Sequence, residues 1–255
     1  MFSPIAAWFR RTFYRPKQIA KKGKYRRLIL EVLEGRDNPS TFNWTGAGGN
    51  NVWENPNNWD KFGNLPTIDY DVSIPTGQTV VVTGLDSAAK NVVAYDLVIE
   101  GTLSVGQVLS AHDLVVDGAL VVGSDVGAHD LVVDGALWVG SDVSAHDLVV
   151  DGSVSVSQNL DAHDLDIDGS LSVGGDLNAQ DLVVEGSLSV GTGLAFDSLA
   201  IDGIVSLSSG CAGIGELLDV SGDGEIYLGT GSYLEITDTA NLYGAMPTIN
   251  GPGNF

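Results

Sequence analysis

Hydrophobic and polar residues alternate along most of the chain, and the alternation restarts every 17 residues from about Val80 onward. A leucine column and a glycine column keep this spacing without a slip. They consist of Leu97, Leu114, Leu131, Leu148, Leu165, Leu182 and Leu199, and of Gly84, Gly101, Gly118, Gly135, Gly152, Gly169, Gly186 and Gly203. A short fixed period predicts a solenoid, because each unit can bury its apolar residues only against its neighbours.

Each repeat has the alternation of β-strands rather than that of a helix. Turn-forming residues interrupt the alternation at three places in a unit: the glycine of VVDG, the GSD triplet and the HD pair. Three short strands per unit are therefore expected. We predict an all-β fold, a single-stranded parallel β-helix of about ten coils with a 17-residue period and a triangular cross-section. Its coils would stack about 4.8 Å apart.

The pattern divides the chain into five segments, and tryptophans mark the second of them. Trp44, Trp53 and Trp59 would cover the first coil, because an uncovered terminal coil pairs edge to edge with other molecules. The segments are a basic leader, disordered or a short helix, at 1–40; an N-terminal cap at 41–79; eight regular coils at 80–213; irregular terminal coils at 214–245, with units starting at Leu218 and Leu234; and a flexible tail at 246–255.

Charged residues are distributed very unevenly. The formal net charge is −21, yet residues 1–36 hold ten of the twelve Lys and Arg residues and only two acids. The remaining residues carry 31 acids against Lys61 and Lys90. We expect no nucleic-acid binding by this acidic body, because neutralising phosphates needs Lys and Arg. The basic residues within 10–27 are the expected contact with a membrane or another anionic surface.

A His-Asp pair recurs at one predicted corner, with histidines at 112, 129, 146 and 163. Like charges one coil apart repel, so the aspartates need screening, protonation or a bound cation. Carboxylates suit calcium, and the candidate calcium ladder consists of Asp113, Asp130, Asp147, Asp164 and Asp181. The alternative is that these aspartates bond their own backbone and keep the rod soluble, while the histidine rings stack. No other cofactor is expected.

Outward-facing apolar residues form a candidate interaction surface. Val115, Val132 and Val149 share a stripe, and Trp138 stands in a neighbouring outward column that is otherwise mostly serine. An exposed apolar face suits a protein partner, a glycan or lateral self-association. The alternative is that valine merely favours strands. Cys211 falls 17 residues after Leu194 in an inward column, so we expect a buried hydrophobe.

We do not expect an enzyme. The chain contains no Gly-x-Ser-x-Gly elbow and no phosphate-binding loop, and no arginine follows Arg36. A lyase acting on acidic sugars needs such a basic residue. Aspartates are so abundant that paired carboxylates for hydrolysis carry no information.

The stretch RLILEVLEGRDNPS resembles the LEPR-XLL type of N-terminal motif, which is found on large bacterial exported and surface proteins. The match lies on Leu30, Glu31, Leu33, Glu34, Arg36, Pro39 and Ser40. The segment that follows, through residue 84, is similar to the entry module of bacterial surface β-helices. The repeats are similar to the coils of surface adhesins and of bactofilins, the polymer-forming cytoskeletal β-helices. The leader nevertheless lacks the continuous apolar core of a secretory signal.

We therefore expect a non-enzymatic, secreted or cell-surface β-solenoid, an adhesin-like structural protein of the bacterial envelope. Its expected partners are envelope or matrix proteins or glycans. The first alternative is a bactofilin-like scaffold, cytoplasmic and membrane-associated, that polymerises through its coil ends. The second alternative is a carbohydrate-active β-helix.

Overall fold

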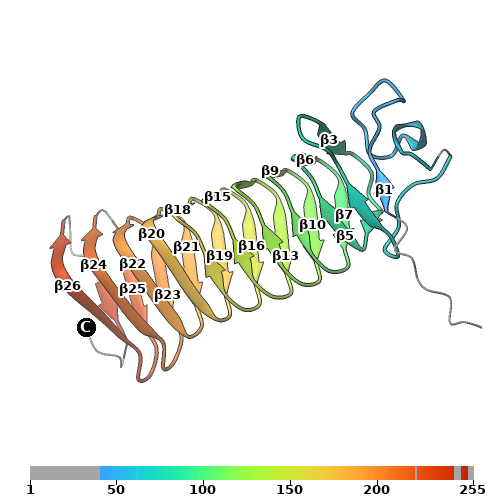
Figure 1. Cartoon of the computed structure of the whole chain (residues 1–255). Helices are drawn as coiled ribbons and strands as arrows, with labels where there is room; N and C mark the ends of the chain where they lie inside the picture. Colours follow the sequence, from blue (N-terminus) through green and yellow to red (C-terminus); the bar gives the residue numbers. More distant parts are fainter. Residues whose placement is uncertain (1–40, 62, 222, 244–247, 252–255) are drawn as a thin grey trace, which may run out of the picture. The chain divides into compact units, whose positions relative to one another are not determined.

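A computed structural model describes residues 41–61, 63–221, 223–243 and 248–251, so the predicted leader at 1–40 lies outside the described residues. These residues are all-β apart from one 3₁₀ turn, η1 (Pro56–Asn58). No helix among them is both long and apolar enough to cross a membrane. The predicted parallel solenoid of about ten coils, with a Trp-rich N-terminal cluster, is confirmed (Figure 1).

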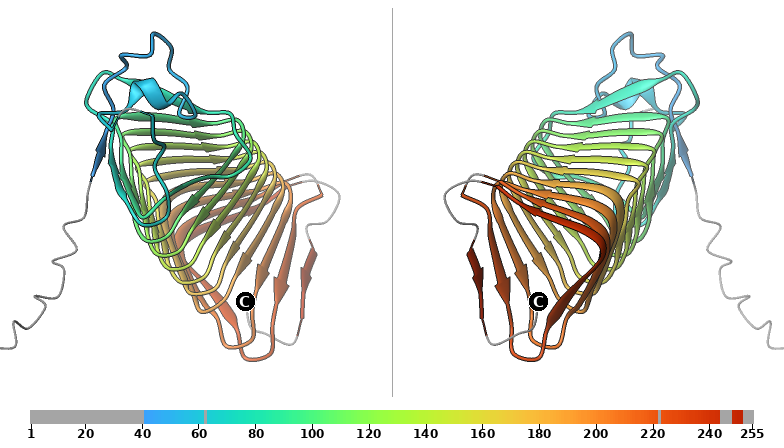
Figure 2. Two further views of the ribbon diagram at one scale, coloured as in Figure 1. Left: turned by 90° about the vertical axis from the view of Figure 1, so that its right-hand side faces the viewer. Right: turned by 90° about the vertical axis from the view of Figure 1, so that its left-hand side faces the viewer.

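Each coil contributes one strand to each of three sides (Figure 2). The first side holds β3 (Thr79–Val82), β6 (Asp96–Ile99), β9 (Asp113–Val116), β12 (Asp130–Val133), β15 (Asp147–Val150) and β18 (Asp164–Ile167). The second side holds β4 (Ser87–Ala89), β7 (Thr102–Val105), β10 (Ala119–Val122), β13 (Ala136–Val139), β16 (Ser153–Val156), β19 (Ser170–Val173), β21 (Ser187–Val190), β23 (Ile204–Leu207), β25 (Glu225–Leu228) and β27 (Thr248–Asn250). The third side holds β2 (Asp71–Ser73), β5 (Asn91–Val93), β8 (Leu109–Ser110), β11 (Val126–Gly127), β14 (Val143–Ser144) and β17 (Leu160–Asp161).

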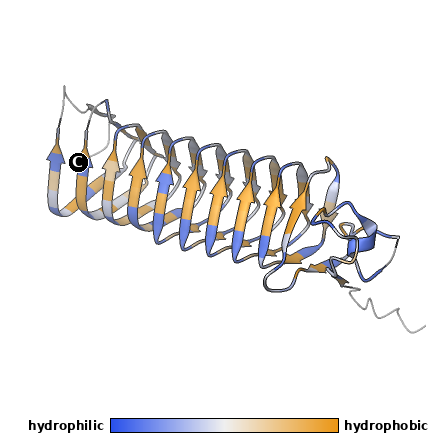
Figure 3. Cartoon of the chain, turned by 90° about the horizontal axis from the view of Figure 1, so that it is seen from above, coloured by the Kyte–Doolittle hydropathy of each residue, from blue (hydrophilic) through white to orange (hydrophobic). Residues whose placement is uncertain are grey.

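Toward the C-terminal coils, the third side and the next first side merge into single bent strands. These strands are β20 (Asp176–Val184), β22 (Gly193–Ile201), β24 (Ala212–Val220) and β26 (Tyr233–Leu242). All coil-to-coil pairings are parallel, and they form one 17-stranded and one 10-stranded sheet. Coloured by hydropathy, the strands make long hydrophobic rows joined by hydrophilic turns (Figure 3).

The 17-residue register holds on the first side from Val80, opposite Leu97, through Leu182, opposite Leu199. Beyond this point the offset grows: Leu199 lies opposite Leu218, 19 residues on. The prediction that Leu234 starts a unit, as Leu218 does, is wrong. Leu234 lies opposite Gly213 on the third side, and the residue opposite Leu218 is Ala240. Two extra residues between β23 and β24 cause the first slip, and longer connections on either side of β25, with a bulge between Gly215 and Leu217, displace the unit expected at Leu234.

One predicted segment needs correction. The expected flexible tail at 246–255 contains strand β27, whose Ile249 lies opposite Ile226 of β25. Glycine and proline are abundant in this tail, but the three residues Thr248–Asn250 form a short uninterrupted stretch that can add to an existing parallel edge.

The core is made of inward-facing columns. Three of these columns contain only Leu and Val, and each member is at most 3% exposed. They are Leu103, Leu120, Leu137, Val154, Leu171, Leu188 and Val205; Val105, Val122, Val139, Val156, Val173, Val190 and Leu207; and Leu109, Val126, Val143, Leu160, Leu177 and Leu194. Burying one such side chain contributes roughly 1.5–3 kcal/mol, so the stack gains most of its stability from contacts between neighbouring coils.

The glycine column marks the corner between the first and second sides. A Cβ added to Gly135 would lie 2.0 Å from the carbonyl oxygen of Gly118 in the preceding coil, and the other column members from Gly101 onward are equally close. None of these glycines has a positive φ. Glycine is therefore required here by the close approach of stacked backbones rather than by an unusual turn.

The N-terminal cluster covers the first coil, and strand β2 already lies on the third side although it belongs to the predicted cap segment, 41–79. Strand β1 (Phe42–Asn43) pairs with β2, and the amide of Trp53 donates to the carbonyl of Val81 at 2.9 Å. Trp59 is fully buried, and its ring makes edge-on contacts with Trp44 and Trp53. These residues occupy edges of the first coil that a preceding coil would otherwise pair with.

Glu54 replaces a missing coil at the glycine corner. In the regular coils two successive corner amides, such as those of Asp117 and Gly118, donate to one carbonyl oxygen of the coil before. In the first coil the equivalent amides of Thr83 and Gly84 donate to the Glu54 carboxylate at 3.2 and 2.9 Å. Sequence reasoning missed Glu54, because it lies 29 residues before its partner and outside the repeats.

We expect Glu54→Gln to lower the free energy of unfolding by about 1–2 kcal/mol, since the amide offers only one acceptor to these donors. Burial raises the pKa of Glu54, but hydrogen bonds from Ser87 and from the backbone outweigh it, so its pKa lies below the ordinary 4.5. The stabilisation is thus complete above pH 4.5 and is lost as the pH falls through the lowered pKa. Thermal unfolding measured between pH 3 and pH 7 tests this.

The matched control is Glu100→Gln, which removes a charge from an exposed residue at the same corner one coil later. It should leave the melting temperature nearly unchanged. An equal loss in both variants would show that charge alone, and not the replaced hydrogen bonds, sets the effect.

Candidate functional site

The repeated histidines stack at the corner between the third and first sides. Successive rings of His112, His129, His146 and His163 are 4.8–5.0 Å apart and nearly parallel, and Tyr95 stacks on the first at 4.9 Å. The alternative prediction of ring stacking is thereby confirmed. All four rings are about half exposed.

Each histidine also contacts the aspartate that follows it. The distances from histidine Nδ1 to aspartate Oδ1 run from 2.5 to 2.7 Å, so each carboxylate accepts a hydrogen bond from the ring of the histidine before it. Four of the five predicted calcium ligands therefore have one oxygen engaged, while Asp181 follows Gln180 instead of a histidine. Calcium binding by this ladder stays a prediction.

The first members of the ladder lie closest to a metal-binding arrangement. Asp96, His112 and Asp113 each offer a ligand atom within 4.8 Å of the others, and Thr79 Oγ1 donates to Asp96 Oδ2 at 3.1 Å. The remaining rungs repeat the same His-Asp pair once per coil. Beyond this first group of three, the ladder offers ligands in pairs along a line, rather than three or four converging on one point.

The predicted valine stripe is less exposed than expected. Val115, Val132 and Val149 are half-buried on the first side, because bulky residues stand above and below each of them in register. Asp166 follows Val149 in this column, and Val183 follows Asp166. The stripe therefore offers only a narrow apolar surface.

Asp166 is electrostatically strained in this stripe. Burial, followed by the nearby charges of Asp168 and Asp151, raises the pKa of its carboxyl group. A raised pKa in the folded state means that the ionised carboxylate destabilises the fold, and this cost disappears as the pH falls below the ordinary 3.8.

We expect Asp166→Val to raise the free energy of unfolding at pH 7 by about 0.5 kcal/mol, through lost repulsion and new contacts with its valine neighbours. The gain should shrink as the pH approaches 3. Asp166→Asn separates the two effects, because it removes the charge without adding the contacts. Urea titrations at both pH values measure the differences, and a gain of Asp166→Asn that persists at low pH would contradict the electrostatic part.

Trp138 lies on the second side and is 45% exposed. It lies between Val121 of β10 and Ser155 of β16 in the parallel register. A shallow depression of about 430 Å³ surrounds it, lined also by small side chains such as Ala136 and Ser172. Of the four residues predicted to form an interaction surface, Trp138 is the most exposed.

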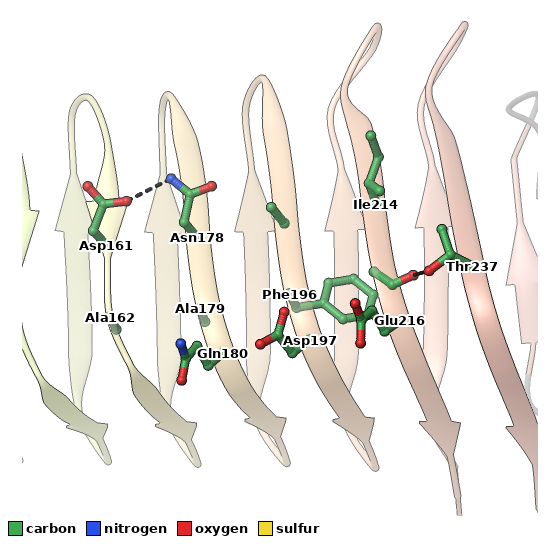
Figure 4. A pocket seen from close by; sticks show the side chains of 12 residues that line it. Asp161, Ala162, Asn178, Ala179, Gln180, Phe196, Asp197, Ile214, Glu216 and Thr237 are labelled. Atoms are coloured by element: carbon green, nitrogen blue, oxygen red, sulfur yellow. Dashed lines mark hydrogen bonds between the residues drawn. The ribbon is translucent and has the colours of Figure 1, made fainter.

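A second groove lies on the bent strands near the C-terminal end and was not predicted (Figure 4). It measures about 470 Å³. Its floor follows a column of alanines that ends in Phe196, and the ring of Phe196 occupies the space above Gly215, whose added Cβ would lie 2.0 Å from the ring. Asp197 and Glu216 lie along one side. The signal in the sequence is the Ala-to-Phe change, which is matched by a glycine one coil later.

Sequence reasoning also missed a polar ladder at the corner between the second and third sides. Here a short Asx side chain accepts a hydrogen bond from the backbone amide of the Asx in the next coil. The column comprises Asp125, Asp142, Asn159 and Asp176, with amide-to-Oδ1 distances of 2.9–3.3 Å. A hydrogen bond from the Ser141 side chain, followed by one from the backbone amide of Asp142, lowers the pKa of Asp125. These Asx side chains therefore stabilise the stacking of coils.

Cys211 is fully buried, as predicted, but it does not lie in the predicted column. Gly213 occupies the position opposite Leu194, and Cys211 lies in the turn before β24. Burial, and to a lesser degree the charge of Asp176, raises the pKa of its thiol. A buried thiol with a raised pKa is inert toward oxidation and metal binding.

Comparison of the chain with protein-family models, with curated proteins and with solved structures finds no match. Its fold places it in the class of β-solenoid repeat proteins.

Proposed function

We propose that this protein is a non-enzymatic, exported structural solenoid, an adhesin-like component of a bacterial envelope or its surrounding matrix. The regular stack of coils is the observation that carries this proposal. Its inward columns serve only the core, and its outward residues repeat without forming a deep, enclosed site among the described residues. Such a design presents a long repetitive surface rather than one reaction centre.

Export is supported by the resemblance of residues 30–40 to the LEPR-XLL type of motif and by the acidic surface. The body beyond Arg36 carries 31 acids and two lysines. A high density of like charges keeps rods apart and soluble outside the cell. The leader itself lies outside the described residues.

The bactofilin-like alternative requires growth by addition of coils at exposed ends. In this protein the first coil is covered, because β1 pairs with β2 and residues near Trp53 pair with Val81. A covered end blocks head-to-tail growth. Filaments that appear with rising protein concentration in electron micrographs would favour the scaffold and contradict our proposal.

Protease shaving of intact producing cells, followed by mass spectrometry of the N-terminus, tests the location directly. We expect peptides of the repeats to be released, and we expect the mature chain to begin near residue 38–41. Protected repeats together with an intact Met1 or Phe2 would overturn the proposal and favour an internal scaffold.

A further inference from the structure

The second side of the regular coils presents an uncharged face, which we call the second-side face. Its outward residues come from β10, β13, β16, β19 and β21 and form two columns in parallel register. They are Ala119, Ala136, Ser153, Ser170 and Ser187 in the first column, and Val121, Trp138, Ser155, Ser172 and Ser189 in the second. An uncharged face five strands wide is notable on so acidic a body.

Trp138 dominates this face. Its indole is 45% exposed, and a Cβ placed on Gly140 would lie 3.4 Å from the Cη2 atom, so the ring leans toward Gly140 at the corner between the second and third sides. Val121, which is 41% exposed, flanks the ring on one side, and Ser155 flanks it on the other. The face thus combines a flat apolar ring with hydroxyl groups a few ångströms away on the next strands.

The charges around the face select its ligand. Exposed acids follow its edge at the glycine corner, one per coil: Asp117, Asp134, Asp151, Asp168 and Glu185. They would repel an anionic polymer. A second copy of this chain would bring the same acidic column against them, so face-to-face packing of two copies is also disfavoured. A neutral ligand meets neither penalty.

We propose that the second-side face binds a neutral polysaccharide, with a sugar ring packed against the indole of Trp138. The apolar C–H face of a pyranose suits an aromatic ring, and its hydroxyl groups suit serine side chains that both donate and accept hydrogen bonds. Ser153, Ser155, Ser170 and Ser172 line the depression around Trp138 and supply such groups. This inference rests on the proposed adhesin-like function for its biological setting. It goes further by naming the class of partner that this face binds.

Co-sedimentation of the full chain with insoluble polysaccharides tests the proposal. The neutral probes are microcrystalline cellulose and chitin, and polygalacturonate serves as the acidic probe. We expect retention on at least one neutral probe and none on polygalacturonate. Trp138→Ala and Ser155→Asp should each reduce the retained fraction at least fivefold, while Trp138→Phe should restore part of it.

The matched control is Val183→Ala, which trims an exposed apolar residue on the first side and should bind like the wild type. Melting curves establish that each variant is folded. The inference is overturned if the wild type binds neither neutral probe, or if Trp138→Ala binds equally well. It is also overturned if sedimentation without a probe depends on Trp138, because the face would then join copies. None of these results bears on protease shaving, so failure of this inference leaves the proposed location intact.

Discussion

Gly135→Ala is expected to lower the free energy of unfolding by about 2–4 kcal/mol, the range of a severe packing conflict. The new methyl group would lie 2.0 Å from the carbonyl oxygen of Gly118. That oxygen accepts the 2.9 Å hydrogen bond from the amide of Ala136. The coils cannot separate to relieve the clash without breaking this bond and its neighbours.

Gly127→Ala is the matched control, since its nearest atom would be Ser110 Oγ at 3.8 Å, an ordinary contact. We expect a change within about 0.5 kcal/mol, because the site is open and alanine costs less conformational entropy than glycine in a strand. Urea unfolding followed by circular dichroism gives both values. Similar losses at the two positions would refute the close-approach explanation.

This glycine column shows how far the sequence could predict the fold. A column that repeats without a slip determines the period, and the alternation around it determines which residues face inward. The corner at Gly135 was predicted as well, but its cause was not. Only the stacked backbones reveal that the carbonyl of the preceding coil, and not a positive φ, excludes a side chain.

Prediction failed where the length of a corner changed. The connection from Leu207 to Ala212 is two residues longer than the one from Val190 to Gly193, with Gly210 at a φ of 80° in the added turn. A fixed 17-residue count therefore assigned Cys211 to the wrong column, and the apolar residues beyond still resemble the repeat, so the unit at Leu234 was placed out of register. An insertion in a turn leaves no mark on hydrophobic alternation.

Some surface features could be predicted from the 17-residue period, and others could not. Stacking of the histidines follows from the period, because identical residues at one corner must lie one coil apart. The exposure of Val132 did not follow, since it depends on how closely neighbouring coils shield each side chain. The role of Glu54 could not be predicted either, because its partners belong to the cap junction, which occurs once in the chain.

Trp59→Ala is expected to destabilise the N-terminal cap by about 3–5 kcal/mol, the usual cost of removing a fully buried aromatic side chain. Trp59 is 0% exposed, and its Nε1 donates to the carbonyl of Trp53 at 2.8 Å. Its loss leaves a cavity between Phe42 and the other tryptophans. Because a solenoid is coupled mainly between neighbours, the damage should stay near the first coil.

Hydrogen exchange measures this local effect. The amides of Trp53 and Val81, which join cap and coil, should lose protection in Trp59→Ala, while the amide of Leu148 in the middle of the stack keeps it. Trp138→Ala removes the same side chain from an exposed position and should change no protection near the cap. Uniform loss along the whole stack would mean that the coils unfold as one unit. Loss confined to the cap also frees the edges of β2 and β3, so this variant should associate through its N-terminal end as concentration rises.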